Sequence, residues 1–103
     1  MIKRLVKMTF RPEFVEDFKA LFNSQKEQIA AMEGCLHVEA LQDIDNRCVF
    51  FTYSLWDDPK YLDAYRNSAF FKEVWSKTKV LFDAKPEAWS TEVVRANVNT
   101  NEA

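Results

Sequence analysis

The spacing of apolar side chains near the start of the chain predicts a strand followed by a long helix. In residues 2–10, apolar side chains alternate with lysines and a threonine, and this two-residue period is typical of a half-buried strand. From Phe14 to Met32 the apolar spacing changes to three, four and seven residues, which predicts an amphipathic helix. Pro12 suits the first helical turn, and Gly34 is expected to close the helix in a left-handed conformation.

Two more strands are predicted on either side of a polar turn. The two-residue period returns from Cys35 to Leu41, and residues 43–46 have side chains that bond to their own backbone in turns. The third strand, Arg47 to Trp56, is apolar or aromatic on both faces, and such a strand is normally central and covered on both sides. One face carries Val49, Phe51, Tyr53 and Leu55, and the other carries Cys48, Phe50 and Trp56.

The second half of the chain predicts two helical segments and a last strand. Asp57-Asp58-Pro59 combines a carboxylate cap with a proline in the first turn, which is a helix start. Asn67-Ser68 can cap a further helix, which we expect to run to Phe82 and to be broken by Lys85-Pro86. Residues 89–94 alternate again and predict the fourth strand.

The predicted order, β-α-β-β-α-β, is that of an α+β, ferredoxin-like fold with a four-stranded antiparallel sheet and two helices on one face. Residues 1–95 are expected to form this domain, and residues 96–103 a polar, frayed tail. We expect the face without helices to carry Phe50 and Trp56. A second copy of the chain is the simplest cover for that face, which predicts a homodimer.

Composition narrows the possible partners. The 103-residue chain has a net charge of −2, so it lacks the basic field that binds nucleic acid or an anionic membrane surface. Its 15% aromatic content suggests an apolar cavity or a buried interface. The single glycine, Gly34, and the single histidine, His37, exclude glycine-rich phosphate loops and histidine-rich metal motifs. Lys7 interrupts what would be the apolar part of a signal peptide, so we expect a cytoplasmic protein.

Three segments stand out beyond their periodicity: Glu33-Gly34-Cys35-Leu36, Trp56-Asp57-Asp58, and the run from Leu62 to Phe71. Together they resemble the antibiotic biosynthesis monooxygenase family, over roughly residues 2–94. The resemblance implies a dimeric α/β barrel. Tyr65 stands where the family commonly has a helix histidine, and Trp75 stands where the haem-degrading branch has its axial histidine. Because an indole cannot ligate iron, a haem-degrading activity is disfavoured unless His37 supplies the ligand from a different strand.

The resemblance implies a cofactor-independent monooxygenase, which oxidises a quinol or polycyclic phenol with O2 in an apolar pocket. Such chemistry requires a dry aromatic cavity with a few polar groups, and no metal or flavin. On this hypothesis His37 and Tyr65 are the catalytic groups, His37 because its ordinary pKa lies near neutrality. The expected substrate-binding residues are Trp56, Phe71, Trp75, Tyr53 and Arg66.

Each assignment has a structural alternative. His37 could lie at a dimer seam or in solvent, Tyr65 could be a packing residue, and Arg66 could be a solvated helix arginine. Arg4 interrupts an apolar strand face, so it needs a partner such as Glu39 or Glu92, or else it reaches the cavity mouth.

The function also has alternatives. The fold could serve as a non-catalytic, small-molecule-binding or stress-associated dimer. The sheet could also be only an assembly surface, in which case the barrel would be filled solid by side chains and would have no cavity.

Overall fold

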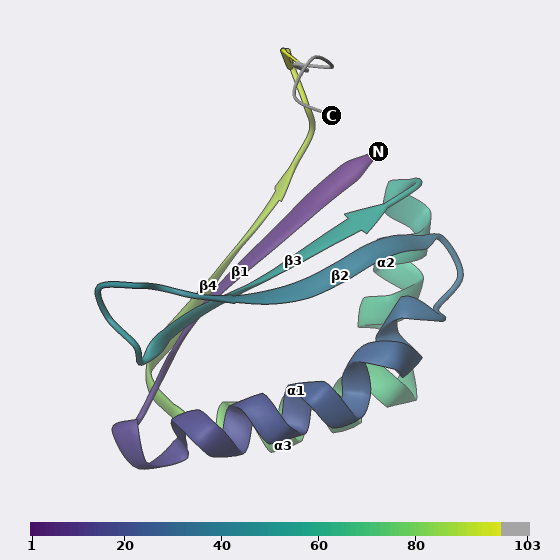
Figure 1. Ribbon diagram of the computed structural model, residues 1–103. Coiled ribbons are helices and arrows are strands. Elements are labelled where there is room, and N and C mark those ends of the chain that lie inside the picture. Colours follow the sequence, from purple (N-terminus) through teal and green to yellow (C-terminus); the bar gives the residue numbers. More distant parts are fainter. Residues whose placement is uncertain (98–103) are drawn as a thin grey trace.

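In this computed structural model, which describes residues 1–97, all the helices gather on one face of a twisted antiparallel sheet (Figure 1). The elements are β1 (Ile2–Phe10), a 3-10 turn (Pro12–Phe14), α1 (Val15–Ala30), β2 (Cys35–Gln42), β3 (Val49–Trp56), α2 (Pro59–Arg66), α3 (Ala69–Lys79) and β4 (Phe82–Thr91). The four strands lie in the order β2-β3-β1-β4. The predicted α+β, ferredoxin-like fold is confirmed. Most of the predicted tail, residues 98–103, lies outside the described residues.

Local sequence fixes the helix starts as predicted. The Asp58 carboxylate accepts a hydrogen bond of 3.0 Å from the Lys60 amide, and Pro59 occupies the first turn of α2. The Ser68 hydroxyl accepts a hydrogen bond of 3.1 Å from the Phe71 amide and caps α3. These caps satisfy backbone N–H groups that have no partner inside the helix, so both helices begin at defined positions.

Gly34 joins α1 to β2 in the left-handed conformation that the sequence predicts, with φ of +79°. Its Cα packs directly against the ring of Tyr61 in α2, which leaves no room for a Cβ. Its carbonyl accepts a hydrogen bond of 2.9 Å from the Asp57 amide. Gly34 therefore ties the start of β2 to the end of β3 and the start of α2.

The predicted last strand and the end of the last helix were both misplaced. The helix α3 ends at Lys79, and β4 already begins at Phe82, whose ring lies 5.4 Å from that of Phe10. Pro86, expected as a helix breaker, lies inside β4. A proline is tolerated there because β4 is an edge strand and its register with β1 shifts near this point.

The start of β3 also differs from the prediction. Arg47, expected to begin this strand, lies in the turn before it, where its guanidinium donates a hydrogen bond of 2.6 Å to the side chain of Gln42. The strand begins two residues later, at Val49. The side-chain contact to Gln42 keeps Arg47 within the connection between β2 and β3.

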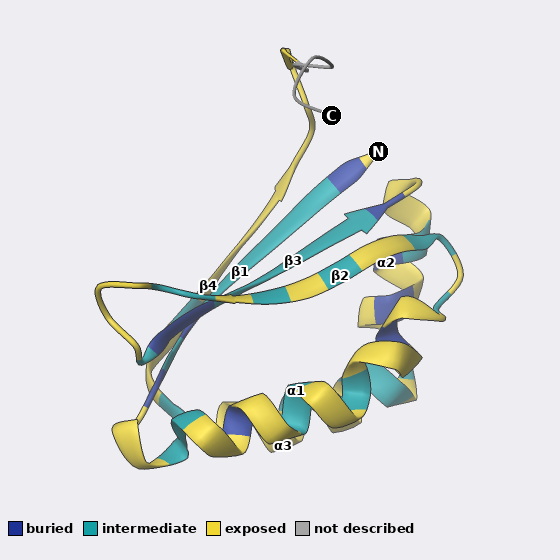
Figure 2. Cartoon of the chain, in the orientation of Figure 1, coloured by how far each residue is buried: buried dark blue, intermediate teal, exposed yellow. Residues whose placement is uncertain are grey.

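The prediction that Phe50 and Trp56 lie on the face without helices was wrong. Both are buried beneath the helices, Phe50 at 3% and Trp56 at 0% exposure. Antiparallel pairing places Phe50 opposite Met8 and Trp56 opposite Ile2, and all four belong to the core between sheet and helices (Figure 2). Successive side chains of a strand point to opposite faces, so the residues next to Phe50 and Trp56 in β3, Phe51 and Leu55, lie on the face that the helices do not cover.

That opposite face of the sheet is called the uncovered face below. Its apolar side chains are Leu5, Leu41, Phe51, Tyr53, Leu55 and Trp89. Leu41 and Trp89 are 43% and 45% exposed, although both have large apolar side chains. No helix within residues 1–97 is long and apolar enough to cross a membrane.

Candidate active site

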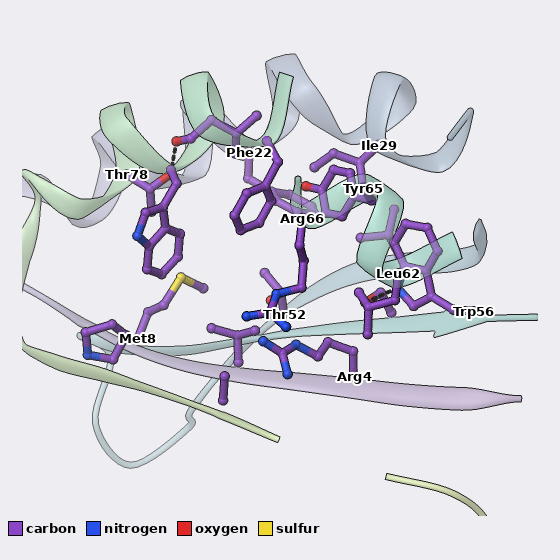
Figure 3. A pocket seen from close by; sticks show the side chains of 18 of the residues that line it. Arg4, Met8, Phe22, Ile29, Thr52, Trp56, Leu62, Tyr65, Arg66 and Thr78 are labelled. Atoms are coloured by element: carbon purple, nitrogen blue, oxygen red, sulfur yellow. Dashed lines mark hydrogen bonds between the residues drawn. The ribbon is translucent and has the colours of Figure 1, made fainter. Parts of the chain in front are cut away.

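A cleft of about 330 Å³ lies between the sheet and the helices (Figure 3). It separates two buried clusters, one around Trp56, Leu62 and Tyr65 and the other around Phe10, Phe18 and Phe50. Side chains of all three helices and all four strands contribute to its wall. Its existence contradicts the hypothesis of an interior filled solid by side chains.

One wall of the cleft is a continuous row of aromatic rings. Trp56 and Tyr65 stack at 5.2 Å, Tyr65 meets Phe71 edge-on at 5.0 Å, and Phe71 stacks on Trp75 at 6.1 Å with an angle of 7° between the rings. The row runs from β3 through α2 to α3, so the packing of three elements holds it in place. All four residues were candidates from the sequence, and all four line the cleft.

Tyr65 is the phenol of that row. It is buried, at 8% exposure, and its hydroxyl points toward the interior of the cleft (Figure 3). Burial raises the pKa of Tyr65 to about 12, and the neighbouring Cys35 adds to the shift. The hydroxyl therefore stays protonated at neutral pH. Tyr65 can donate a hydrogen bond to a bound molecule, but it is poorly suited to act as a base.

Two arginines bring positive charge to this apolar space: Arg4 is half-buried, whereas Arg66 is exposed, as expected for an arginine at the solvent side of a helix. Arg66, at the end of α2, and Arg4, on β1, both line the cleft, and their guanidinium groups approach the same region from opposite sides (Figure 3). Arg4 donates a hydrogen bond of 3.0 Å to the hydroxyl of Ser90. Burial lowers the pKa of Arg4, and the positive charge of Arg66 lowers it further. Arg4 thus reaches the cavity, and its partner is Ser90 rather than a carboxylate.

The structure does not bring His37 and Tyr53 to the cleft. His37 is paired with Leu55 on the uncovered face, and half of its side chain is exposed. Its imidazole Nε2 lies 3.6 Å from the Glu39 carboxylate, and its ring lies 5.9 Å from that of Tyr53. The sheet therefore separates His37 from Tyr65, and the two do not form one site within a single chain.

Sequence reasoning missed the polar residues on the floor of the cleft. Thr52 and Ser54 lie on β3 between the buried Phe50 and Trp56, and both line the cleft. The Ser54 hydroxyl accepts a hydrogen bond of 3.0 Å from the Trp56 indole N–H, which fixes that ring. The available signal was their polarity, because these are the two hydroxyl residues on an otherwise apolar strand face.

Together, the ferredoxin-like sheet and the aromatic cleft beneath its helices define a small α+β domain with a ligand-sized cavity. The sequence model of one family, antibiotic biosynthesis monooxygenase, matches residues 1–76, and the chain belongs to that family. The matched part runs from β1 through most of α3. No curated protein matches the chain.

Solved structures support the same fold. A conserved protein from Methanosarcina mazei Go1 is 27% identical, with a TM-score of 0.83 over 87% of this chain and 89% of the other. A candidate antibiotic biosynthesis monooxygenase from Deinococcus radiodurans is 14% identical, with a TM-score of 0.87 over 97% and 99%. Another from Nitrosomonas europaea is 17% identical, with a TM-score of 0.84 over 92% and 100%. At these last two identities the likeness shows the fold alone.

Proposed function

We propose that the protein is a cofactor-independent monooxygenase that oxidises a quinol or polycyclic phenol with O2 in the cleft. The observation that carries this proposal is the aromatic wall from Trp56 to Trp75, which offers an apolar surface of ring faces and edges beside a few hydrogen-bonding groups. Membership of the monooxygenase family supports it. The cleft volume of about 330 Å³ is near the lower end for ligand cavities, which favours a small fused-ring substrate.

The proposed reaction balances without a further reductant. The substrate gains one oxygen atom from O2 and loses two hydrogen atoms, and these leave with the second oxygen atom as water. All four electrons that O2 accepts come from the substrate, because a phenol becomes a quinone or a quinol becomes a hydroxyquinone. The role of the chain is to hold the electron-rich ring, to stabilise its ionised form and to exclude bulk water.

Within the cleft, Tyr65 is the proposed hydrogen-bond donor to the substrate oxygen, while Trp56, Phe71 and Trp75 form the binding wall. Tyr65 suits this role because its ring is fixed by stacking and its hydroxyl is protonated at neutral pH. His37 lies across the sheet, so the proposal gives it no part in this cleft.

Oxygen uptake by the purified protein tests the proposal. A panel of naphthols, anthrols and quinols is added, and uptake is compared with autoxidation in the absence of protein. We expect uptake above that blank, reduced about tenfold to a hundredfold by Tyr65→Phe, because the variant loses one oriented donor to a developing anion. His37→Ala is the matched control and should keep full uptake. Uptake equal to the blank for every compound would contradict the proposal.

A second candidate is a non-catalytic small-molecule-binding protein of the same fold. The observation that favours it is the polar lining of the cleft, where the family's common helix histidine is replaced by a tyrosine that remains protonated. This candidate predicts that fused-ring phenols quench the fluorescence of Trp75 and Trp56 without consuming oxygen. Quenching together with uptake above the blank would exclude it.

We also propose that the protein is a homodimer in which a second copy covers the uncovered face. That face presents Phe51, Tyr53 and Leu55 on its central strand, flanked by the exposed Leu41 and Trp89. Light scattering at micromolar concentration should give the mass of a dimer. Phe51→Lys should give a folded monomer, because it places a charge in the middle of the apolar face. A wild-type monomer would refute this arrangement.

A further inference from the structure

We propose that Arg4 and Arg66 form a paired-guanidinium site that binds the substrate as its phenolate, so that the cleft needs no general base. This inference rests on the proposed function and deepens it, because it names the ionised form of a fused-ring phenol as the species that the cleft selects. The two arginines come from different elements, β1 and the end of α2, and meet only through the fold.

The first support is that no carboxylate within residues 1–97 forms an ion pair with either arginine. The ion pairs found within residues 1–97 involve other residues, and Arg4 has only the neutral Ser90 hydroxyl as its side-chain partner. Glu87 is the one carboxylate among the residues that line the cleft. It is paired with Lys7 on β1, out of phase with Arg4, and makes no ion pair with either arginine.

The second support is the environment of the two charges. Arg4 is half-buried and Arg66 is exposed at the mouth of the cleft, so desolvation acts on Arg4, whose pKa it lowers together with the positive charge of Arg66. Two like charges beside an apolar cavity are unfavourable in the empty protein, and a bound anion relieves both the repulsion and part of the desolvation. Guanidinium groups also keep their charge at all relevant pH values, so each can donate a charge-assisted hydrogen bond to a phenolate oxygen.

The third support is the position of the pair relative to the aromatic wall. Figure 3 shows the Arg66 side chain extending from α2 toward the sheet, below the hydroxyl of Tyr65, with the Arg4 side chain lying along the sheet close to the end of Arg66. A ring lying along the aromatic wall can direct its oxygen toward these three donors. The proton is released to bulk water before the phenolate enters the cleft, and the positive charges then favour binding of the anion over the neutral phenol.

A phenol with a visible ionisation tests the inference directly. The probe is 7-hydroxycoumarin, a fused-ring phenol whose neutral and anionic forms differ in absorbance and fluorescence. It is titrated with acid and base, free and bound to the full chain. We expect the pKa of the bound probe to lie about one unit below that of the free probe, since nearby opposite charges shift a pKa by about 1 to 3 units and burial opposes them.

Variants assign the shift to the two arginines. Arg4→Gln and Arg66→Gln should each raise the pKa of the bound probe by about one unit, a tenfold change in its acid dissociation constant. Arg66→Lys keeps the positive charge and should retain most of the shift. This result would show that the effect of Arg66→Gln comes from the lost charge and not from a folding defect. Arg11→Gln, which removes an exposed arginine outside the cleft, is the matched control and should change nothing.

Several results would overturn the inference. A pKa of the bound probe at or above the free value would show that apolar burial dominates, and a shift equally sensitive to Arg11→Gln would show a general surface effect. Failure of the probe to bind at millimolar concentration would also reject the site. If oxygen uptake persists in any of these cases, only the paired-arginine site is rejected. If the shift is found without uptake, the monooxygenase proposal fails and the anion site stands.

Discussion

Replacing Tyr65 by phenylalanine should remove a steep loss of stability at alkaline pH. The Tyr65 phenol is stacked on Trp56 and 8% exposed, and burial raises its pKa to about 12. In the unfolded chain the same phenol has a pKa of about 10. A pKa that is higher in the folded state means that folding favours the protonated form. The resulting stabilisation is complete below about pH 10 and is lost as the pH rises toward about 12.

The size of the effect follows from the two pKa values. At about pH 12, the unfolded phenol is almost fully ionised, whereas the folded phenol is about half ionised. The wild type should therefore lose about 2 kcal/mol of unfolding free energy between about pH 9 and about pH 12 that Tyr65→Phe does not lose. Lysine deprotonation also affects stability in this range, but it is common to both proteins and cancels in the comparison.

Urea unfolding followed by circular dichroism, at half-unit steps of pH, measures this difference. Tyr53→Phe, which removes a phenol from the uncovered face, is the matched control. Its unfolding free energy should fall with rising pH as in the wild type, because Tyr65 is still present. Parallel curves of unfolding free energy against pH for the wild type and Tyr65→Phe would refute the burial of a neutral phenol in this cleft.

Three further changes test the packing that supports the cleft, each by the free energy of unfolding in urea. Gly34→Ala should cost about 2–5 kcal/mol, since it adds left-handed strain and pushes a methyl group into Tyr61; a loss below about 1 kcal/mol would contradict that contact. Phe10→Ala should cost about 3–5 kcal/mol because the ring is fully buried and stacks on Phe18 at 4.3 Å, and a neutral result would mean that this cluster is not core. Ser68→Ala should cost about 1 kcal/mol through the lost helix cap, with Ser68→Asp restoring it.

The parts of the fold that could be predicted are those fixed by local chemistry. The caps at Asp58 and Ser68 depend on a side chain two or three residues from its partner, so the sequence contains both groups. The left-handed turn at Gly34 is similarly local. The end of α3 differs from the prediction because Lys85-Pro86 indicates a helix end, whereas Pro86 lies in an edge strand that accommodates it at a register shift.

The faces of β3 could not be assigned because both alternating sets are apolar. Phe50 and Trp56 differ little in character from Phe51 and Tyr53, and a one-residue change of register exchanges the two sets. The choice depends on which face the helices cover, and that is decided by the whole chain. The polar positions Thr52 and Ser54, on the same side as Phe50 and Trp56, mark the cleft rather than the solvent.

In the candidate site, too, features set by local sequence could be predicted and features set by the whole fold could not. The aromatic wall could be predicted because Phe71 and Trp75 are one helical turn apart, and because Tyr65 and Phe71 lie in the segment that resembles a known family. The pairing of Arg4 with Arg66 could not, because 61 residues lie between them in the sequence and no local pattern joins them. The position of His37 on the uncovered face could not be predicted either, because it depends on the register of β2 against β3, which pairs His37 with Leu55.

The activity proposed for the cleft is the insertion of one oxygen atom from O2 into a fused-ring phenol. The most direct test is to run the reaction under isotopically labelled O2 and to determine the mass of the product. We expect one labelled oxygen atom in the product and one in water, with product formation greatly reduced by Tyr65→Phe and unchanged by His37→Ala. Product oxygen derived from solvent would contradict the proposed monooxygenase activity, and product formed equally by both variants would contradict the proposed role of Tyr65.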